Sequence, residues 1–397
     1  MTRLRLFALL VCGFSILVVS YALLMMTFVR IPGKLEEADF LVYYSVGRVA
    51  RQYGFHQVYN LNLEAVVQAQ TAGVPLGTWH ILPPNHPPFL YPFLELLAGL
   101  DYRTAYIGYA MLLAFLVIAG LPALYGALRR NNWSRAQAVI VLSGVILFEP
   151  LFISVLKGQD SAVLLLGGLL WFSGLIWGDD RLAGLGLALT LIRPQIAILL
   201  AIPFLFQRRK VFGWFCIGGL VLGLYSFALV GWSGDKDFLQ ILTLSAGGEG
   251  YGLAEAAMFN FTGLALRLAP GLSIHLVHAL GWGLFAAALV VLCIVWDLSK
   301  SIGYRHIALA VTLSLFAAPH LYYHDLALLV IPLLGLSLAG IKAGKLTVRT
   351  AATLPLLASL VFLTGEFVDL VRFVFPFLLM VLLLGLAWLV EKPRETH

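Results

Sequence analysis

The chain has 397 residues, of which 61% are hydrophobic and 12% charged, and its mean hydropathy is +0.93. Water-soluble domains carry about 25% charged residues, and disordered chains are poor in apolar residues, so the composition excludes both classes. A net charge of +6 would suggest nucleic acid in a soluble protein. In a multi-pass membrane protein, surplus Lys and Arg mark the cytoplasmic loops, so we expect a membrane protein with no nucleic-acid partner.

Apolar runs near the length that crosses a membrane recur along the chain. The first follows Arg3 and Arg5 and continues to about Val29, which is longer than a signal-peptide core, so we expect it to stay as a membrane helix. The sequence predicts an all-α polytopic fold with a single integral membrane domain over residues 1–397. The further runs are 105–128, 137–156, 161–177, 211–231, 274–297, 349–364 and 372–390.

Two longer runs are interrupted in the middle. Arg193-Pro194-Gln195 breaks the run 181–206, and the polar tract 319–325 breaks the run 303–340. Because Pro lacks a backbone donor and disfavours helix at the residue before it, we expect each run to fold back as a hairpin. The segment 88–100 is too short to span and is expected to be re-entrant or interfacial. The bundle then has about 11 to 12 membrane helices, some of them short or broken.

The distribution of charge supports these hairpins. With the N-terminus inside, the cytoplasmic segments carry 16 of the 26 Lys and Arg, and the external segments carry 15 of the 20 Asp and Glu. A single crossing by 181–206 would put the basic segment 207–210 outside, against the positive-inside rule. We therefore expect a plasma (bacterial inner) membrane protein with both termini cytoplasmic. The 16 basic residues are Arg3, Arg5, Arg129, Arg130, Arg135, Arg181, Arg208, Arg209, Lys210, Lys300, Arg305, Lys342, Lys345, Arg349, Lys392 and Arg394.

The external side gathers the two long loops, 30–104 with short helices and 232–273, together with the tips of the broken hairpins. Irregular backbone at membrane depth is tolerated only where it lines a cavity or is buried in protein. We therefore expect an external cavity formed by these loops, and the functional site within it.

Asp39 opens a predicted helix that ends before Gly54. A short acceptor side chain at a helix start is typical of an N-cap. A carboxylate beside an apolar cavity is also suited to accept a hydroxyl proton, so Asp39 is either a cap or a general base.

Polar residues also stand at two breaks between apolar runs. Lys157 and Gln159 separate one run from the next, and Gln159, like Gln195, is either a helix-end cap or a binding residue. Arg193 is an ionisable residue within an apolar run, which marks a functional site or an internal ion pair with an acid such as Glu149. Its forked guanidinium suits a phosphate ligand.

The tract from His320 to Asp325 includes histidines four residues apart, His320 and His324. This spacing allows a shared metal ligand, but no HExxH motif accompanies it, so substrate hydrogen bonding by His and Tyr is favoured and no metal is expected. No nucleotide-binding or nucleophile-elbow motif occurs either, so we expect no cofactor.

Taken in order, these motifs resemble glycosyltransferase family 87, a family of the GT-C superfamily of membrane glycosyltransferases that includes polyprenyl-phosphate-mannose-dependent mannosyltransferases. The resemblance covers about residues 36–340. It implies a polyprenyl-phosphate hexose donor, with mannose expected, a lipid or glycan acceptor, an external active site and an inverting reaction. It rests on Asp39-Phe40-Leu41-Val42-Tyr43-Tyr44, Tyr59, Phe89-Leu90-Tyr91-Pro92, Gly158-Gln159, Arg193-Pro194-Gln195 and the tract from His320 to Asp325.

The resemblance also implies roles for single residues. Asp39 matches the catalytic aspartate of the family, which would act as the base. We expect Arg193, with Lys157 and His324, to neutralise the phosphate leaving group. The sugar hydroxyls would be oriented by Gln159, Tyr43 and His320, and Asp325 completes the set of expected substrate-binding residues.

The chain departs from the family pattern in three places. Arg193 stands where the family usually has Lys, the stretch 54–58 replaces a small-polar segment, and Asp160 follows Gln159 where Asn or an apolar residue is commoner. Arg in place of Lys keeps the positive charge and allows a forked contact with phosphate.

Two other classes of protein share some of these features. A lipid or lipid-linked-sugar transporter or flippase would also have broken helices and intramembrane charge, but the halves 1–200 and 201–397 show no internal repeat. A polymerase or ligase of lipid-linked polysaccharide would use a similar cavity without needing the early Asp. We expect an enzyme that is monomeric.

Overall fold

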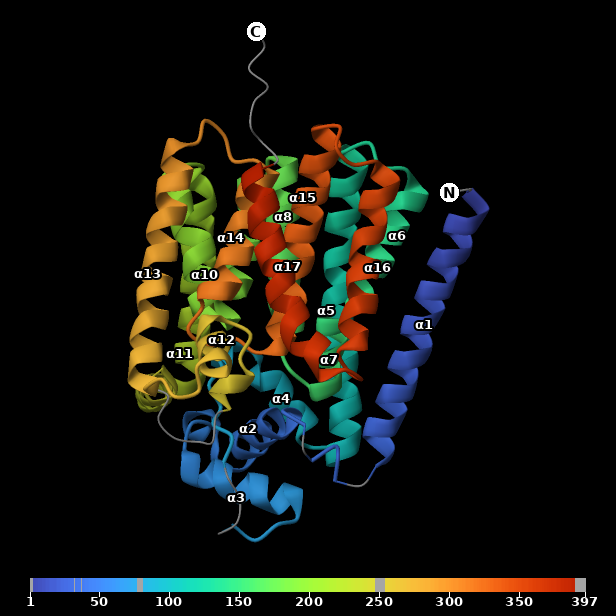
Figure 1. Cartoon of the computed structure of the whole chain (residues 1–397). Coiled ribbons are helices and arrows are strands. Elements are labelled where there is room, and N and C mark those ends of the chain that lie inside the picture. Colours follow the sequence, from blue (N-terminus) through green and yellow to red (C-terminus); the bar gives the residue numbers. More distant parts are fainter. Residues whose placement is uncertain (1–2, 32, 37, 77–80, 247–253, 390–397) are drawn as a thin grey trace.

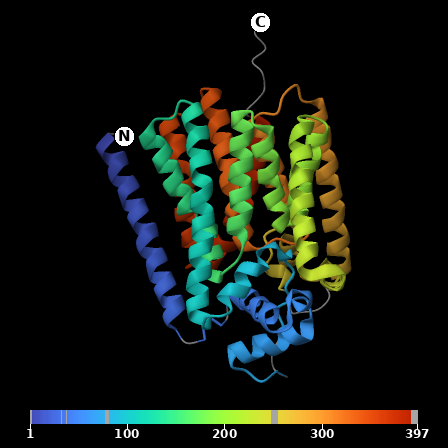
Figure 2. The same ribbon diagram turned by 180° about the vertical axis from the view of Figure 1, so that it is seen from behind.

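The computed structural model describes residues 3–31, 33–36, 38–76, 81–246 and 254–389, and this part of the chain is helical with no strand. Long helices run side by side as a bundle, and α2 (Phe40–Tyr53) and α3 (Leu61–Ala72) lie across one end of it (Figure 1). Helix α1 (Arg3–Arg30) stands at the edge in both views, where it packs against α16 (Val348–Thr364) (Figure 2).

Six helical spans in the described part are long and apolar enough to cross a membrane. A seventh is the bent pair α6 (Arg135–Ile146) and α7 (Glu149–Lys157). Several apolar helices, too short to pass that test, complete the bundle, so the multi-pass architecture is supported and the number of crossings stays a prediction. Besides α1, the six comprise α5 (Tyr102–Arg130), α11 (Arg209–Ala246), α13 (Ile274–Leu298), α17 (Asp369–Leu389), and η7 (Tyr323–Leu329) continued by α15 (Val330–Lys342).

One segment that the sequence predicts as a plain helix is bent. The run 137–156 divides into α6 and α7 with an angle of 41° between them. Pro150 in the first turn of α7 cannot donate to the preceding helical turn, and Phe148 before α7 is extended. The run predicted to end at 231 does break at that residue: α11 kinks at Gly231, where φ is 66°, and a further helical stretch follows the kink.

Both predicted hairpins are present. The first consists of α9 (Asp180–Leu189), η4 (Thr190–Ile192), α10 (Pro194–Ala201) and η5 (Ile202–Leu205). Arg208 Nε donates to Asp180 Oδ1 at 2.9 Å, so this segment leaves and returns at the same end of the bundle. Its turn at Arg193 therefore lies inside the bundle, away from that end. The second hairpin pairs α14 (Tyr304–Ala317) with α15, which pack against each other.

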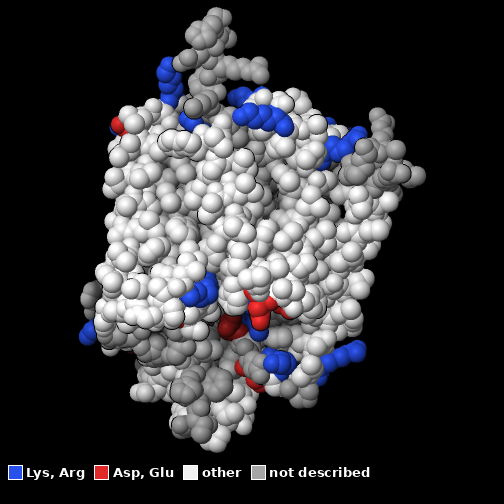
Figure 3. Space-filling model, viewed as in Figure 1, with Lys and Arg blue, Asp and Glu red and all other residues white. Residues whose placement is uncertain are grey.

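The basic connections gather at the end of the bundle away from α2 and α3. Arg130 donates to the carbonyl of Trp177, and the hydroxyl of Tyr304 donates to Asn131. Helix α8 (Ser161–Trp177) runs from that end to the other, a distance of about 25 Å for its 17 residues. Figure 3 shows Lys and Arg at both ends of one face, and most of the Asp and Glu visible there near the lower end. Lys392, Arg394 and residues 247–253 of the second loop lie outside the described residues.

Small residues allow α9 to pack closely between its neighbours. A Cβ on Gly186 would lie 2.5 Å from the backbone nitrogen of Trp171 in α8, and one on Gly184 would lie 2.4 Å from the carbonyl oxygen of Val211 in α11. Lipid is as apolar as a leucine side chain, so close van der Waals packing of this kind stabilises helix pairs in membranes.

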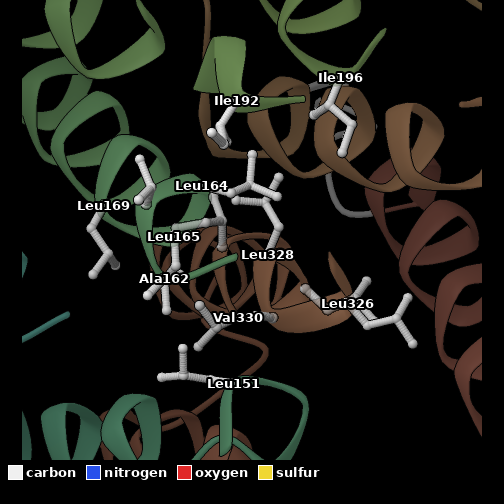
Figure 4. Close-up of a cluster of buried hydrophobic side chains, with 14 of the residues drawn as sticks. Leu151, Ala162, Leu164, Leu165, Leu169, Ile192, Ile196, Leu326, Leu328 and Val330 are labelled. Carbon is white, nitrogen blue, oxygen red and sulfur yellow. The ribbon is translucent and has the colours of Figure 1, made fainter. Parts of the chain in front are cut away.

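A buried apolar cluster lies where α7, α8, η4, α10 and η7 meet (Figure 4). Ile192 and Leu326 belong to it, and each is next in the chain to a charged residue, Arg193 or Asp325. Close packing leaves such side chains few alternative positions, so the cluster fixes the backbone from which those charges project. The labelled members are Leu151, Ala162, Leu164, Leu165, Leu169, Ile192, Ile196, Leu326, Leu328 and Val330.

Candidate active site

A cavity of about 670 Å³ lies at the end of the bundle that α2 and α3 cover. All eight site residues expected from the sequence line it, although they come from four separate segments of the chain. The structure therefore brings them together, and their individual roles stay predictions. They are Asp39, Tyr43, Lys157, Gln159, Arg193, His320, His324 and Asp325.

Asp39 directly precedes α2 but does not cap it with its side chain. Its φ and ψ are −62° and −18°, and its carboxylate accepts no hydrogen bond from the first turn of the helix. Within the part of the chain that the structure describes, this carboxylate has no hydrogen-bonding or ion-pairing partner, and it is only partly buried. Asp39 thus offers a free acceptor to the cavity. Tyr43 lies four residues later, on the same face of α2.

The turn that carries Lys157 and Gln159 is pressed against the start of α2. Gly158 ends α7 in the left-handed region, with φ 69°, and a Cβ there would lie 2.5 Å from Phe40 Cβ. Only glycine satisfies both conditions without strain. The close approach places Lys157 and Gln159 on the same cavity wall as Asp39.

Arg193 lies in a buried ion network at the start of α10. Its Nε donates to Asp325 Oδ1 at 3.0 Å, and its Nη2 lies 2.9 Å from Asp160 Oδ1. Ser161 Oγ donates to the same oxygen of Asp325 at 2.9 Å. Glu149, the acid named as a possible partner for Arg193, instead accepts a hydrogen bond from Tyr323 at 2.7 Å.

His86 is a site residue that the sequence reasoning did not select. Its Nδ1 lies 2.9 Å from Arg193 Nη1, and its Nε2 lies 3.0 Å from the hydroxyl of Tyr43. The hydroxyls of Tyr59 and Tyr91 both donate to the carbonyl of His86. Burial lowers the pKa of His86 to about 4, so the ring is neutral at physiological pH. The local signal is a single His within a proline-rich stretch, 83–88.

The remaining expected residues make fewer polar contacts. Lys157 Nζ lies 5.0 Å from the ring centroid of Phe28, and no described carboxylate pairs with it. His324 Nε2 is 3.7 Å from Asp325 Oδ2. The carbonyl of His320 accepts a hydrogen bond from Gln195, and burial lowers the pKa of His320 to about 4. Among the described residues, no three His, Cys, Asp or Glu side chains cluster as metal ligands would.

The family model of glycosyltransferase family 87 matches residues 85–319, which is more than half of the chain. The chain belongs to glycosyltransferase family 87. This confirms the family resemblance seen in the sequence and supports glycosyltransferase activity. Neither the curated proteins nor the solved structures gave a match. The region shared with family 87 includes His86, Lys157 and Arg193, and it excludes Asp39 and the tract after Pro319.

Proposed function

We propose that this family 87 protein transfers a hexose, with mannose the expected sugar, from a polyprenyl-phosphate donor to a hydroxyl of a lipid or glycan acceptor. The proposal depends on the carboxylate of Asp39, which lines the cavity. Among the described residues this carboxylate has no partner, and Lys157, a cation that lines the same cavity, has no carboxylate partner. A base and a phosphate-binding cation in one cavity are the groups that such a transfer requires.

In the proposed reaction, Asp39 takes the proton of the acceptor hydroxyl as its oxygen attacks the anomeric carbon of the donor. The bond between that carbon and the phosphate oxygen breaks, and its electron pair leaves with the polyprenyl phosphate. Attack from the face opposite the leaving group inverts the configuration, so a β-linked donor gives an α-linked product. No nucleotide sugar or metal takes part in these steps.

The charge that develops on the phosphate needs a cation within reach. Lys157 is the cavity-lining Lys or Arg in the described part that has no carboxylate partner, because Arg193 pairs with two aspartates and Arg372 faces Glu366. We assign the phosphate to Lys157, with His324 as a second hydrogen-bond donor to it.

Uncharged groups would orient the sugar. The hydroxyl of Tyr43 donates to Gln159 Oε1 at 3.2 Å, and both side chains line the cavity. Neutral His320 adds a ring with one donor and one acceptor nitrogen. Apolar side chains on another part of the wall, Ile198 and Trp282, suit an isoprenoid chain.

The proposed site faces the external, periplasmic side of the inner membrane, and both termini are cytoplasmic. The basic connections at the opposite end of the bundle support this orientation. We propose that the protein acts as a monomer.

The test is transfer by purified protein reconstituted in liposomes. A panel of polyprenyl-phosphate hexoses with labelled sugars is offered together with lipid and glycan acceptors, and the product linkage is determined. Transfer from the mannose donor with inversion is expected. Movement of the intact donor across the bilayer without any transfer would overturn the proposal and favour a flippase.

A further inference from the structure

We infer that Arg193 is a positioning residue, which holds His86, Asp160 and Asp325 together beside the cavity and so fixes the start of α2, which Asp39 directly precedes. This inference rests on the proposed function, because the reaction that Arg193 would support is the proposed sugar transfer. It assigns to Arg193 a role other than direct contact with the donor phosphate.

Each of the three guanidinium nitrogens already lies within hydrogen-bonding or ion-pairing distance of a group in the protein. Nε and Nη2 meet Asp325 and Asp160, while Nη1 lies 2.9 Å from His86 Nδ1 and donates to the carbonyl of Ile192 at 3.2 Å. Only 6% of Arg193 is exposed. A phosphate that took over these contacts would displace partners that the buried cation needs.

The charge of the network also argues against phosphate contact. One guanidinium faces two carboxylates, Asp160 and Asp325, which are 0% and 1% exposed. The three groups together carry one excess negative charge when both acids are ionised. Electrostatic interaction is strong in a site from which water is excluded, so this network repels an anion. Attraction for the phosphate must come from elsewhere on the wall.

A chain of hydrogen bonds connects Arg193 with α2. Because Arg193 donates to His86 Nδ1, the proton of the neutral ring is assigned to Nε2, which then donates to the Tyr43 hydroxyl at 3.0 Å. Tyr43 in turn donates to Gln159. The rings of Tyr43 and His86 also stack, with centroids 5.1 Å apart. Tyr43 lies in the first turn of α2, and Asp39 directly precedes that turn. Fixing Tyr43 therefore also fixes the backbone at Asp39.

Removing the guanidinium of Arg193 should change the protonation state of His86, which can be measured. The charged and titratable groups around this ring are Asp160, Asp325, His324 and Tyr43, besides Arg193 itself. Without Arg193, the two carboxylates favour an imidazolium that donates from both nitrogens. The pKa of His86 should therefore rise in Arg193→Gln.

The experiment compares Arg193→Gln with Lys157→Gln as the matched control. Positioning predicts that Arg193→Gln lowers kcat by about tenfold or more, changes the donor KM by less than about twofold, and adds an ionisation to the pH profile. Lys157→Gln should raise the donor KM by about tenfold and keep the wild-type pH profile. A tenfold higher donor KM with an unchanged pH profile in Arg193→Gln would show that Arg193 contacts the phosphate.

A second variant serves if Arg193→Gln does not fold. Asp160→Asn keeps Arg193 paired with Asp325 and removes the excess charge. If Arg193 binds the donor phosphate, losing the charge of Asp160 would free its guanidinium for that contact, and the donor KM would fall. Positioning predicts a lower kcat with no gain in donor affinity.

A readout without turnover separates this inference from the proposed function. In spectra of protein labelled with nitrogen-15 histidine, His86→Gln identifies the signals of His86. At about pH 6 the wild type should show a neutral ring protonated at Nε2, and Arg193→Gln should show an imidazolium. A neutral ring in both proteins overturns the inference, whereas absence of transfer in the wild type would overturn only the proposed function.

Discussion

Asp39→Asn separates a catalytic base from a residue that only begins α2. The carboxylate makes no capping hydrogen bond, and within the described residues it has no ion pair to lose. The amide has nearly the same shape, so the free energy of unfolding should change by less than about 0.5 kcal/mol. The amide cannot accept a proton at neutral pH, so transfer should fall by about 10²-fold to 10⁴-fold.

This loss in rate corresponds to about 2.7 to 5.4 kcal/mol in the activation barrier, several times the largest expected change in stability. The assay must follow single-turnover transfer from the polyprenyl-phosphate hexose, because binding of the donor should be unchanged. Thermal unfolding in detergent checks that the variant is folded. Glu36→Gln is the matched control, since Glu36 stands three residues earlier in the same loop and does not line the cavity.

Glu36→Gln should keep the wild-type rate. If Asp39→Asn is folded and transfers sugar at a rate close to that of the wild type, then Asp39 is not the base and the mechanism fails at its first step.

Three further predictions test the structure around the site. Gly158→Ala should lower the free energy of unfolding by about 2 to 5 kcal/mol, measured by thermal unfolding, because Ala is strained at φ 69° and its Cβ would meet Phe40 at 2.5 Å; unchanged stability would contradict the close approach. Burial raises the pKa of Glu64 to about 8, so the folded state holds a proton that the unfolded state releases above about 4.5. Stability should fall as pH rises through this interval, by up to about 5 kcal/mol, whereas Glu64→Gln should show no such fall; equal pH curves for the two proteins would refute a neutral Glu64. In a protein without its native cysteines, a cysteine at Tyr322 should react with an impermeant thiol reagent from outside and one at Arg209 should not; the reverse pattern would invert the proposed orientation.

The positions of the helices were largely predictable from local pattern. Apolar run length set most of the long helices, and proline set both hairpins, because a missing backbone donor acts within one helical turn. Gly54 ends α2 as expected, with φ 90°. The bend before Pro150 was missed, since the apolar run continues across it and hydropathy carries no information on backbone angle. The alternation of apolar runs and polar breaks also predicted that the expected site residues stand at helix ends on the external side of the bundle. All eight of them line one cavity.

The partners of these residues depended on the tertiary packing. Arg193 pairs with an acid 132 residues away and with a histidine 107 residues away, and no local rule selects either of them. Glu149 and Asp160 both lie at helix starts in the same part of the chain, yet only Asp160 meets Arg193. The partner of Arg193 is decided where α8, α10 and η7 pack on one apolar cluster. A charge buried there must pair with a side chain that the packing brings within about 3 Å.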